Sequence, residues 1–422
     1  MNIFSLKWLR RSLLTSIYIL GVLGIVGSGV GSWECVQDGF LDDCFDGPLP
    51  PLPPLPPFTI PAGGGTEGFN NTVTSVAPAL DSSDDVYVGG SFTIYKNSAA
   101  NGIARINNDG SLDTGFVTGT GFDAPVYTVS PANDGSGDVY VGGSFTSYNG
   151  SAVGHIARLN LDGTLDTGFD TGTGLNNRVN IIALATDGSG DVYIGGIFTS
   201  YNGTAVGSGL IRLNDDGSLD AGFSTGSGWG ESSIALATDD SGDVYVARSS
   251  SPGIARLNKN GSIDAGFDTG LSGFNDEVRA IAVAIDSSGD VYVAGYFDDY
   301  NGTGNSGIAR LNSDGSLDAG FVTVGWLDSQ GNFITPAIDA SGDIYVDSKL
   351  VNGIVRLNVD GSHHTGFDTG IGQFGGFGVR PNSVALAIDG SSDVYVGGIF
   401  TRYNLIPAAR IARLTAEGAF VR

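Results

Sequence analysis

The chain has 422 residues, with 68 glycines, 41% hydrophobic residues and a formal net charge of −25. Glycine at about twice its usual share, without a Gly-X-Y period, indicates many turns, while the hydrophobic content still supports a large core. Nucleic acids and anionic membranes repel a polyanion, so the charge argues against both as partners. A turn-rich, all-β protein fits these numbers.

Residues 1–32 have the order of a secretory signal peptide. A basic region around Arg10 and Arg11 precedes an apolar run from Leu13 to Val26, and small residues follow it up to Ser32. We therefore expect a secreted or cell-surface protein, with cleavage after Ser32. An uncleaved membrane anchor is the alternative, because the apolar stretch is just long enough to span a bilayer.

Residues 33–63 form a linker with two cysteines and a proline-rich stretch. A bridge between Cys35 and Cys44 would close a short local loop in an exported segment, and a free pair is the alternative. Proline at the density of residues 47–61 imposes polyproline II. We expect a spacer, and the alternative is that its apolar stripe docks on a partner or on the folded domain.

Residues 64–422 consist of seven copies of a repeat of roughly 50 residues. The phrase Asp-Val/Ile-Tyr begins at Asp85, Asp138, Asp191, Asp243, Asp290, Asp343 and Asp393. A second phrase places an arginine at Arg105, Arg158, Arg212, Arg256, Arg310, Arg356 and Arg413. A third phrase, ending in Gly-Phe, occurs in six copies, at Phe116, Phe169, Phe223, Phe267, Phe321 and Phe367.

Each copy contains four short apolar runs bounded by Gly, Asp, Asn or Ser. In the third copy we expect strands at 179–185, 191–199, 210–214 and 218–223. This pattern predicts an all-β, seven-bladed β-propeller of four-stranded blades, and a β-helix or a string of sandwiches is the alternative. Thr66 to Phe69 match the Asp-Thr-Gly-Phe of other copies, so an N-terminal strand near 64–69 is expected to complete the last blade and close the ring.

The repeat resembles a known family. Gly-Gly-Ser-Phe-Thr-Ser-Tyr-Asn-Gly, followed by Ile-Ala-Arg-Leu-Asn, stands at 142–169 and again with small changes at 195–223. This pattern is similar to the delta-60 repeat family of predicted bacterial β-propellers. The resemblance covers about residues 64–422, although the fourth copy has lost its Gly-Gly-x-Phe half. It implies a propeller in an exported or surface protein, and it implies no activity, because no shared catalytic residues define the family.

One face of the predicted propeller is acidic and uniform. The first turn of every copy is Asp-x-x-x-Asp, and the third turn is also acidic. The stretch from Asn160 to Asp166 resembles part of a calcium loop, but Arg158 stands where such a loop places a carboxylate. We therefore expect no cofactor and no metal, with Asp side chains bonding their own turns, while weak calcium binding stays open. The repeated arginine predicts an ion pair with a neighbouring aspartate.

The other face differs from copy to copy, and variable loops on a rigid scaffold are where binding usually occurs. The candidate ligand-binding residues on this face are Arg178, Trp229, Arg279, Tyr300, Trp326 and Arg380. Bulky apolar residues also recur at matching positions of the links between copies, which favours packing there instead: Phe122, Leu175, Trp229, Phe274, Trp326 and Phe374.

No catalytic signature is present: the sequence has no Gly-x-Ser-x-Gly elbow, P-loop or cysteine-rich metal set. His363 and His364 replace the usual Leu-Asp of the sixth copy and point to opposite sides of a strand. We expect a monomeric binding or scaffold module that engages a glycan or a protein through the variable face, more a binder than an enzyme. A hydrolase with a site at the central channel and a purely architectural surface protein are the alternatives.

Overall fold

The computed structural model describes residues 68–421, apart from 208, 227–228, 230–232, 248–252, 271, 324–331, 349–352, 368–373 and 376–380. The expected signal segment, both cysteines and the proline-rich stretch lie outside the described residues. Within the described part of the chain, no helix is long and apolar enough to cross a membrane.

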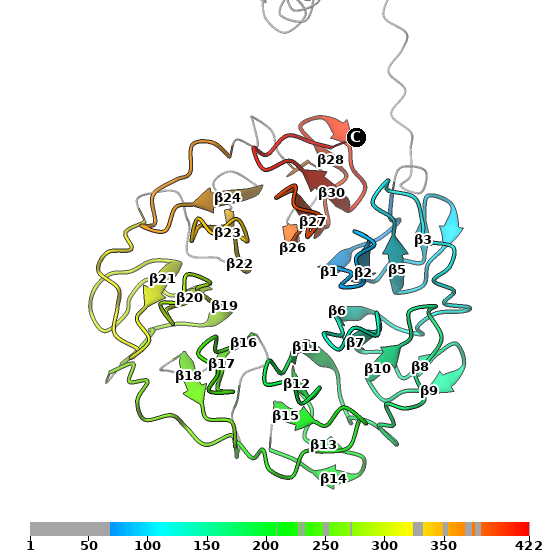
Figure 1. Cartoon of the computed structure of the whole chain (residues 1–422), viewed down its shortest axis with the longest axis horizontal. Coiled ribbons are helices and arrows are strands. Elements are labelled where there is room, and N and C mark those ends of the chain that lie inside the picture. Colours follow the sequence, from blue (N-terminus) through cyan, green and yellow to red (C-terminus); the bar gives the residue numbers. More distant parts are fainter. Residues whose placement is uncertain are drawn as a thin grey trace, which may run out of the picture. The chain divides into compact units, whose positions relative to one another are not determined.

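The described chain is all β and repeats one small antiparallel sheet, as the sequence predicts. Each sheet has three strands, with the second strand of the copy in the middle. The sheets of the first three copies are β1 (Val73–Pro78), β2 (Val86–Gly90) and β5 (Ile103–Ile106); β6 (Val126–Pro131), β7 (Val139–Gly143) and β10 (Ile156–Leu159); β11 (Val179–Leu184), β12 (Val192–Gly196) and β15 (Leu210–Leu213). In Figure 1 the sheets follow one another in chain order, with first strands such as β6 and β11 nearest the centre of the view.

The later copies repeat this arrangement. Their sheets are β16 (Ile234–Leu236), β17 (Val244–Ala247) and β18 (Ile254–Leu257); β19 (Val278–Val283), β20 (Val291–Gly295) and β21 (Ile308–Leu311); β22 (Ile334–Pro336), β23 (Ile344–Ser348) and β24 (Gly353–Leu357); β26 (Pro381–Leu386), β27 (Val394–Gly398) and β30 (Ile411–Leu414). Every residue of the central strand β12 is buried, because sheets pack against both of its faces.

The fourth predicted strand of the copies is not a strand. In the third copy, the run 218–223 makes one isolated bridge, Leu213 to Leu219, and then turns. Asp220 causes the turn, because its Oδ1 accepts a hydrogen bond from the Gly222 N–H at 2.7 Å. Aspartate two residues before glycine favours such a turn over an extended chain, and the same bond recurs at Asp113, Asp166, Asp264 and Asp318.

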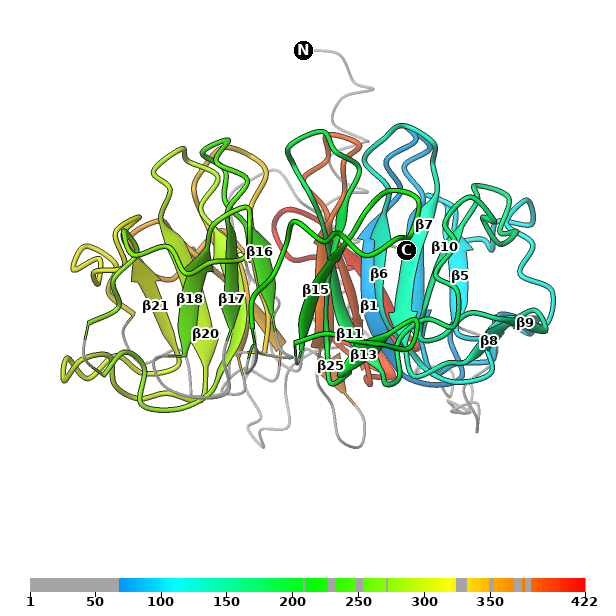
Figure 2. The same cartoon turned by 90° about the horizontal axis from the view of Figure 1, so that it is seen from below.

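The second connection of several copies is a small hairpin rather than a simple turn. These hairpins are β3 (Ile94–Tyr95) with β4 (Ser98–Ala99), β8 (Ser147–Tyr148) with β9 (Ser151–Ala152), β13 (Ser200–Tyr201) with β14 (Thr204–Ala205), and β28 (Arg402–Tyr403) with β29 (Ile406–Pro407), which β25 (Phe374–Gly375) extends. Figure 2 shows β8 and β9 at one edge of the sheets, opposite the β6–β7 turn. The tyrosine of each hairpin points inward and is buried.

The link residues pack on these tyrosines. Phe122 bridges Tyr148, and its ring lies 4.6 Å from the tyrosine ring. The five described link residues, Phe122, Leu175, Trp229, Phe274 and Phe374, are between 0 and 7% exposed. The packing interpretation therefore holds for these five, and Trp326 lies outside the described residues.

The start of the described chain occupies a different place from the expected one. Phe69 bridges Tyr95, as Phe122 bridges Tyr148, so it takes the position of a link residue. Its N–H donates to Ala409 O at 3.0 Å, just as the Leu175 N–H donates to Gly154 O. The expectation that Phe69 stands for the Gly-Phe of a last blade is wrong, because the link motif and the Gly-Phe motif both place an aromatic residue after glycine.

Serine hydroxyls join neighbouring sheets through one recurring bond. The Val129 N–H donates to Ser75 Oγ at 3.2 Å, and the Ile281 N–H donates to Ser233 Oγ at 3.0 Å. The last and first sheets share the same contact, since the Val76 N–H donates to a serine hydroxyl of β26, Ser383 Oγ, at 3.1 Å. First strands of consecutive copies are therefore held at a common spacing.

Candidate functional site

The predicted arginine–aspartate ion pairs are present on the uniform face. In the first sheet, the Arg105 guanidinium donates from Nη2 to Asp81 Oδ2 at 2.6 Å and from Nε to Asp85 Oδ2 at 3.0 Å. A third carboxylate, that of Asp113, lies 3.3 Å from Nε. In the sixth sheet His364 takes this third place, with Nε2 3.8 Å from Asp343 Oδ2.

The arginine of the first cluster is buried. Arg105 is 4% exposed, and its guanidinium lies over the Tyr87 ring at 5.4 Å. Burial raises the pKa of Asp81, but hydrogen bonds from Ser83 and Arg105 outweigh it and hold that pKa below its usual value. Burial raises the pKa of Tyr87 to about 12. One guanidinium against three carboxylates leaves an excess of negative charge at this edge of the sheet.

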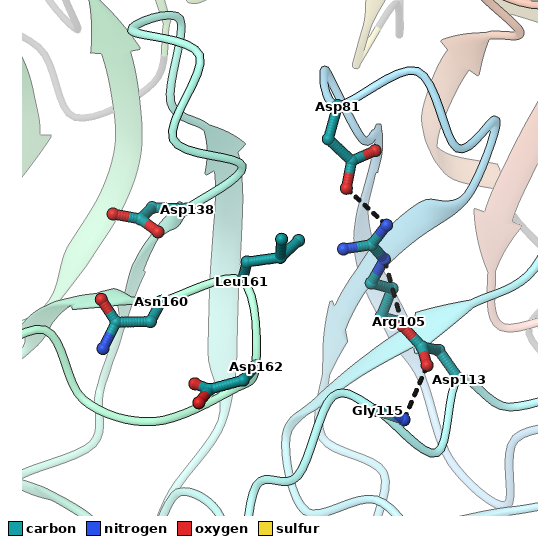
Figure 3. Close-up of a pocket in the computed structure, with 8 residues that line it drawn as sticks. All are labelled: Asp81, Arg105, Asp113, Gly115, Asp138, Asn160, Leu161 and Asp162. Carbon is teal, nitrogen blue, oxygen red and sulfur yellow. Dashed lines mark hydrogen bonds and ion pairs between the residues drawn. The ribbon is translucent and has the colours of Figure 1, made fainter.

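A groove of about 580 Å³ runs between the first and second sheets on this face (Figure 3). Asp81, Arg105 and Asp113 lie on one side of it, and Asn160 and Asp162 lie on the other. Its carboxylates already have partners in their own sheets: Asp162 Oδ1, for example, accepts hydrogen bonds from the N–H and hydroxyl of Thr164. Among the described residues, no group of three or more His, Cys, Asp or Glu side chains is arranged to hold a metal.

The other face carries one polar arrangement that does not repeat among the described sheets. It begins at Asp347 in β23, where the equivalent position of other central strands is Gly89, Gly195 or Ala294. The Asp347 carboxylate accepts hydrogen bonds from the Asn332 N–H at 2.6 Å and from Asn332 Nδ2 at 2.7 Å. Burial raises the pKa of Asp347, against the effect of these hydrogen bonds.

Arg279, at the start of β19, extends this arrangement into the neighbouring sheet. Its Nη1 donates to Asn332 Oδ1 at 3.3 Å, and its Nη2 lies 3.1 Å from Glu277 Oε2. The guanidinium lies over the Tyr296 ring, 4.1 Å from its centroid. The side chains of Arg279 and Glu277 are about one-third exposed, at 34% and 33%. We call Glu277, Arg279, Asn332 and Asp347 the inter-sheet network.

Three of the other predicted ligand-binding residues lie in the described part of the chain, and their recorded contacts are with residues outside this network. Trp229 is 7% exposed and donates from Nε1 to Thr225 O at 2.6 Å. Tyr300 is 2% exposed, and its hydroxyl donates to Gly315 O. Arg178 is half-buried over the Tyr127 ring at 5.9 Å. Trp326 and Arg380 lie outside the described residues, and ligand binding by any of these five stays a prediction.

Sequence reasoning missed Asp347 and Asn332. The available signal was the replacement of Val-Tyr-Val-Gly-Gly by Ile-Tyr-Val-Asp-Ser in the sixth copy. A charged residue at a position that elsewhere holds glycine or alanine needs a polar partner, because an unpaired buried carboxylate is costly.

Comparison with known families agrees with this architecture. Residues 83–116, 135–169, 188–223, 241–267, 287–321 and 392–420 match the family described as "Domain of unknown function (DUF5122) beta-propeller". The matched segments are similar to the repeats of this family. The matched DUF5122 segments leave out the copy that contains Asp347. The β-propeller part of the expected resemblance is thereby confirmed.

Two solved structures are similar to this chain, and the first of them is described as a propeller. The WD40 beta propeller domain of Doa1 has a TM-score of 0.51 and 16% sequence identity, covering 82% of this chain and 93% of that one. Virginiamycin B lyase from Staphylococcus aureus has a TM-score of 0.49 and 15% identity, covering 78% and 94%. No curated protein matches this chain by sequence. The likeness to the Doa1 domain shows the fold alone.

Proposed function

We propose that the chain is a closed, monomeric, seven-bladed propeller related to the delta-60 repeat proteins, secreted or displayed at the cell surface, and that it binds a glycan or a protein. The inter-sheet network is the observation that carries the binding proposal. It combines charged groups and an amide, beside the Tyr296 ring, on the variable face, whereas the polar groups of the uniform face repeat from copy to copy.

Contacts between the last and first sheets support closure. Asn382 Nδ2 in β26 donates to Val73 O at 2.9 Å, and Thr74 Oγ1 in β1 donates to Val126 O at 2.7 Å. The two bonds join equivalent positions of successive copies. The bond from the Val76 N–H to Ser383 Oγ is a further contact of this kind. The last and first sheets are therefore joined in the same way as the first and second sheets.

The chemistry of the network suits a polar ligand. The side chains of Arg279 and Glu277 are about one-third exposed and supply donors and acceptors, and the Tyr296 ring lies beside them. Binding sites typically combine a few convergent polar groups with an aromatic surface, which is what a sugar ring or a peptide loop requires. Asp347 holds Asn332 in place by accepting hydrogen bonds from its N–H and its Nδ2, and Asn332 in turn accepts a hydrogen bond from Arg279.

A hydrolytic site is the second candidate, and the raised pKa of Asp347 favours it, since acid catalysts need such a shift. The oxygens of Asp347 are engaged by Asn332 and by the Phe333 N–H, so this carboxyl is better suited to positioning than to proton transfer.

Calorimetric titration of the full chain with soluble polysaccharides and synthetic peptides tests the proposal. We expect saturable binding of one component, weakened at least about tenfold in Arg279→Ala, as for a contact at the centre of a site. Lys259→Ala, at an exposed lysine of the uniform face, is the matched control and should bind normally. No binding of any component, or equal binding by both variants, would favour the architectural alternative.

A further inference from the structure

A pocket of about 180 Å³ lies between the first and second sheets, on the variable face. Ser91, Thr93 and Gly102 of the first copy form one side of it, and the link to the second copy contributes Phe122 and Asp123. Typical pockets for drug-sized ligands have roughly 300–1,000 Å³, so this one is suited to a single side chain or a molecule of that size.

The position of Gly102 carries a basic residue in two other copies, His155 in the second and Arg410 in the last. All three have a left-handed backbone, with φ of 78°, 71° and 73°. Each donates its N–H to the carbonyl of the corresponding phenylalanine: Phe92, Phe145 and Phe400. Side chains rarely adopt this conformation, so His155 and Arg410 need contacts that compensate the strain.

A side chain at this position points toward the next copy. At Gly102 a Cβ atom would lie 3.3 Å from Phe122 Cβ and from Val126 Cγ2, both beyond the sheet to which Gly102 belongs. The pocket is therefore the space that such a side chain enters, and glycine leaves it open in the first copy.

Arg410 shows which chemistry this space accepts. Its Nη1 donates to Ile399 O at 3.2 Å and to Phe400 O at 3.1 Å. The strand pairing makes Ser91 and Phe92 the corresponding residues of the first copy, and both line the pocket. The carbonyls that hold a guanidinium in the last copy thus have counterparts beside the open pocket.

Asp123 distinguishes the first pocket from its counterparts. Its Oδ1 accepts hydrogen bonds from the N–H groups of Thr146 at 2.8 Å and Ser147 at 3.0 Å, and its Oδ2 accepts one from the Thr146 hydroxyl. Three other links make the first of these bonds with a neutral asparagine: Asn70, Asn176 and Asn275. A carboxylate has about four acceptor sites, so Asp123 keeps room for a further donor.

The negative charge of Asp123 has no ion-pair partner among the described residues. Hydrogen bonds from Thr146 and Ser147 hold its pKa below the usual value, against the effect of burial, so it is ionised at neutral pH. Burial lowers the pKa of His155, although the charge of Asp123 acts in the opposite direction, and this imidazole is therefore largely neutral at pH 7.

We propose that this pocket binds a guanidinium group, supplied by an arginine side chain of a partner protein or by a small guanidino compound. The guanidinium would donate to the carbonyls of Ser91 and Phe92, as Arg410 does in the last copy, and to the remaining acceptor site of Asp123. Burial lowers the pKa of Arg410, whose two acceptors are neutral carbonyls, so the carboxylate makes the first pocket the better site for a cation. This site is separate from the inter-sheet network and does not depend on it.

Ligand-observed NMR titration of the full chain tests the proposal with three probes: agmatine, acetyl-Gly-Arg-Gly-amide and acetyl-Gly-Lys-Gly-amide. Both guanidinium probes should bind saturably, and the lysine peptide should bind at least about tenfold more weakly, because an ammonium cannot donate to several acceptors in one plane. Tighter binding of the arginine peptide than of agmatine would identify a protein as the source of the group, and the reverse would identify a small compound.

Two variants place the site. Gly102→Arg fills the pocket with the chain's own guanidinium and should abolish binding. Gly135→Arg is the matched control, because Gly135 has a similar φ of 80° with no atom near its Cβ position, and it should bind normally. Asp123→Asn keeps the hydrogen bonds of the other links and should weaken binding about tenfold, whereas Asp314→Asn, at an exposed aspartate, should not.

Three outcomes would overturn the proposal. The first is no saturable binding of either guanidinium probe to a chain that circular dichroism shows to be folded. The second is equal binding of the arginine and lysine peptides, which would indicate general attraction to an acidic surface. The third is unchanged binding in Asp123→Asn, which decides the matter even where Gly102→Arg disturbs folding.

Discussion

At the scale of single residues, the buried ion pairs are the feature whose disruption should cost the most stability. Each repeated arginine holds two or three carboxylates in a place with little access to water, so removal of the guanidinium leaves uncompensated negative charge. An exposed pair such as Lys259 with Asp187, at 2.8 Å, is different, because water screens either charge once the partner is gone.

Arg105→Ala should therefore lower the free energy of unfolding by about 3–5 kcal/mol. Lys259→Ala, whose side chain is 58% exposed, should change it by at most about 1 kcal/mol. Urea unfolding followed by circular dichroism measures both values. Equal effects of the two substitutions would mean that the arginine clusters are not buried as described.

The sequence predicted the arginine clusters but not the inter-sheet network. Seven arginines beside seven Asp-x-x-x-Asp turns are visible because they repeat, and the structure confirms the pairing. Asp347 occurs in one copy only, so a comparison of the copies cannot distinguish it from a random substitution. Its burial, which marks it as unusual, is known only from the structure. Trp229 and Tyr300 were expected in a binding face because they lie in connections; both side chains are buried, and ligand binding by them stays a prediction.

At the scale of elements, the strands were easier to predict than the connections between them. In the third copy, the only one for which strand bounds were predicted, the first three strands end within three residues of the predicted positions, because their apolar runs and bounding turns are strong signals. The fourth run was misassigned, since an aspartate-capped turn competes with the strand after one bridge. The small hairpins were read as simple turns, because two-residue strands leave no periodic pattern.

Phe274 tests the packing of links against hairpins. It is fully buried, with its ring 4.2 Å from Phe297 and 4.5 Å from Tyr300. Phe274→Ala should lower the free energy of unfolding by about 3–5 kcal/mol, the cost of a large cavity in a core. Val322→Ala, at a residue that is 56% exposed, should stay within about 0.5 kcal/mol of the unaltered chain. A small effect of Phe274→Ala in chemical denaturation would show that the link does not pack on the hairpin.

At the scale of the whole molecule, the proposed architecture is a closed ring. The inter-sheet network spans two consecutive sheets, and the ring in addition requires contacts between the last sheet and the first. In an open array, the first and last sheets would expose strand edges and apolar faces that invite aggregation. Closure in the proposed form relies on non-covalent contacts such as the bond from the Val76 N–H to Ser383 Oγ.

Native-state hydrogen exchange of the Val76 and Val129 amides tests closure most directly. Both donate to a serine hydroxyl of a neighbouring first strand, Val129 between consecutive sheets and Val76 between the last and first. We predict that the two amides are protected to within about tenfold of each other, and that Ser383→Ala speeds exchange at Val76 as Ser75→Ala does at Val129. Rapid exchange at Val76 alongside slow exchange at Val129, unchanged by Ser383→Ala, would contradict a closed ring.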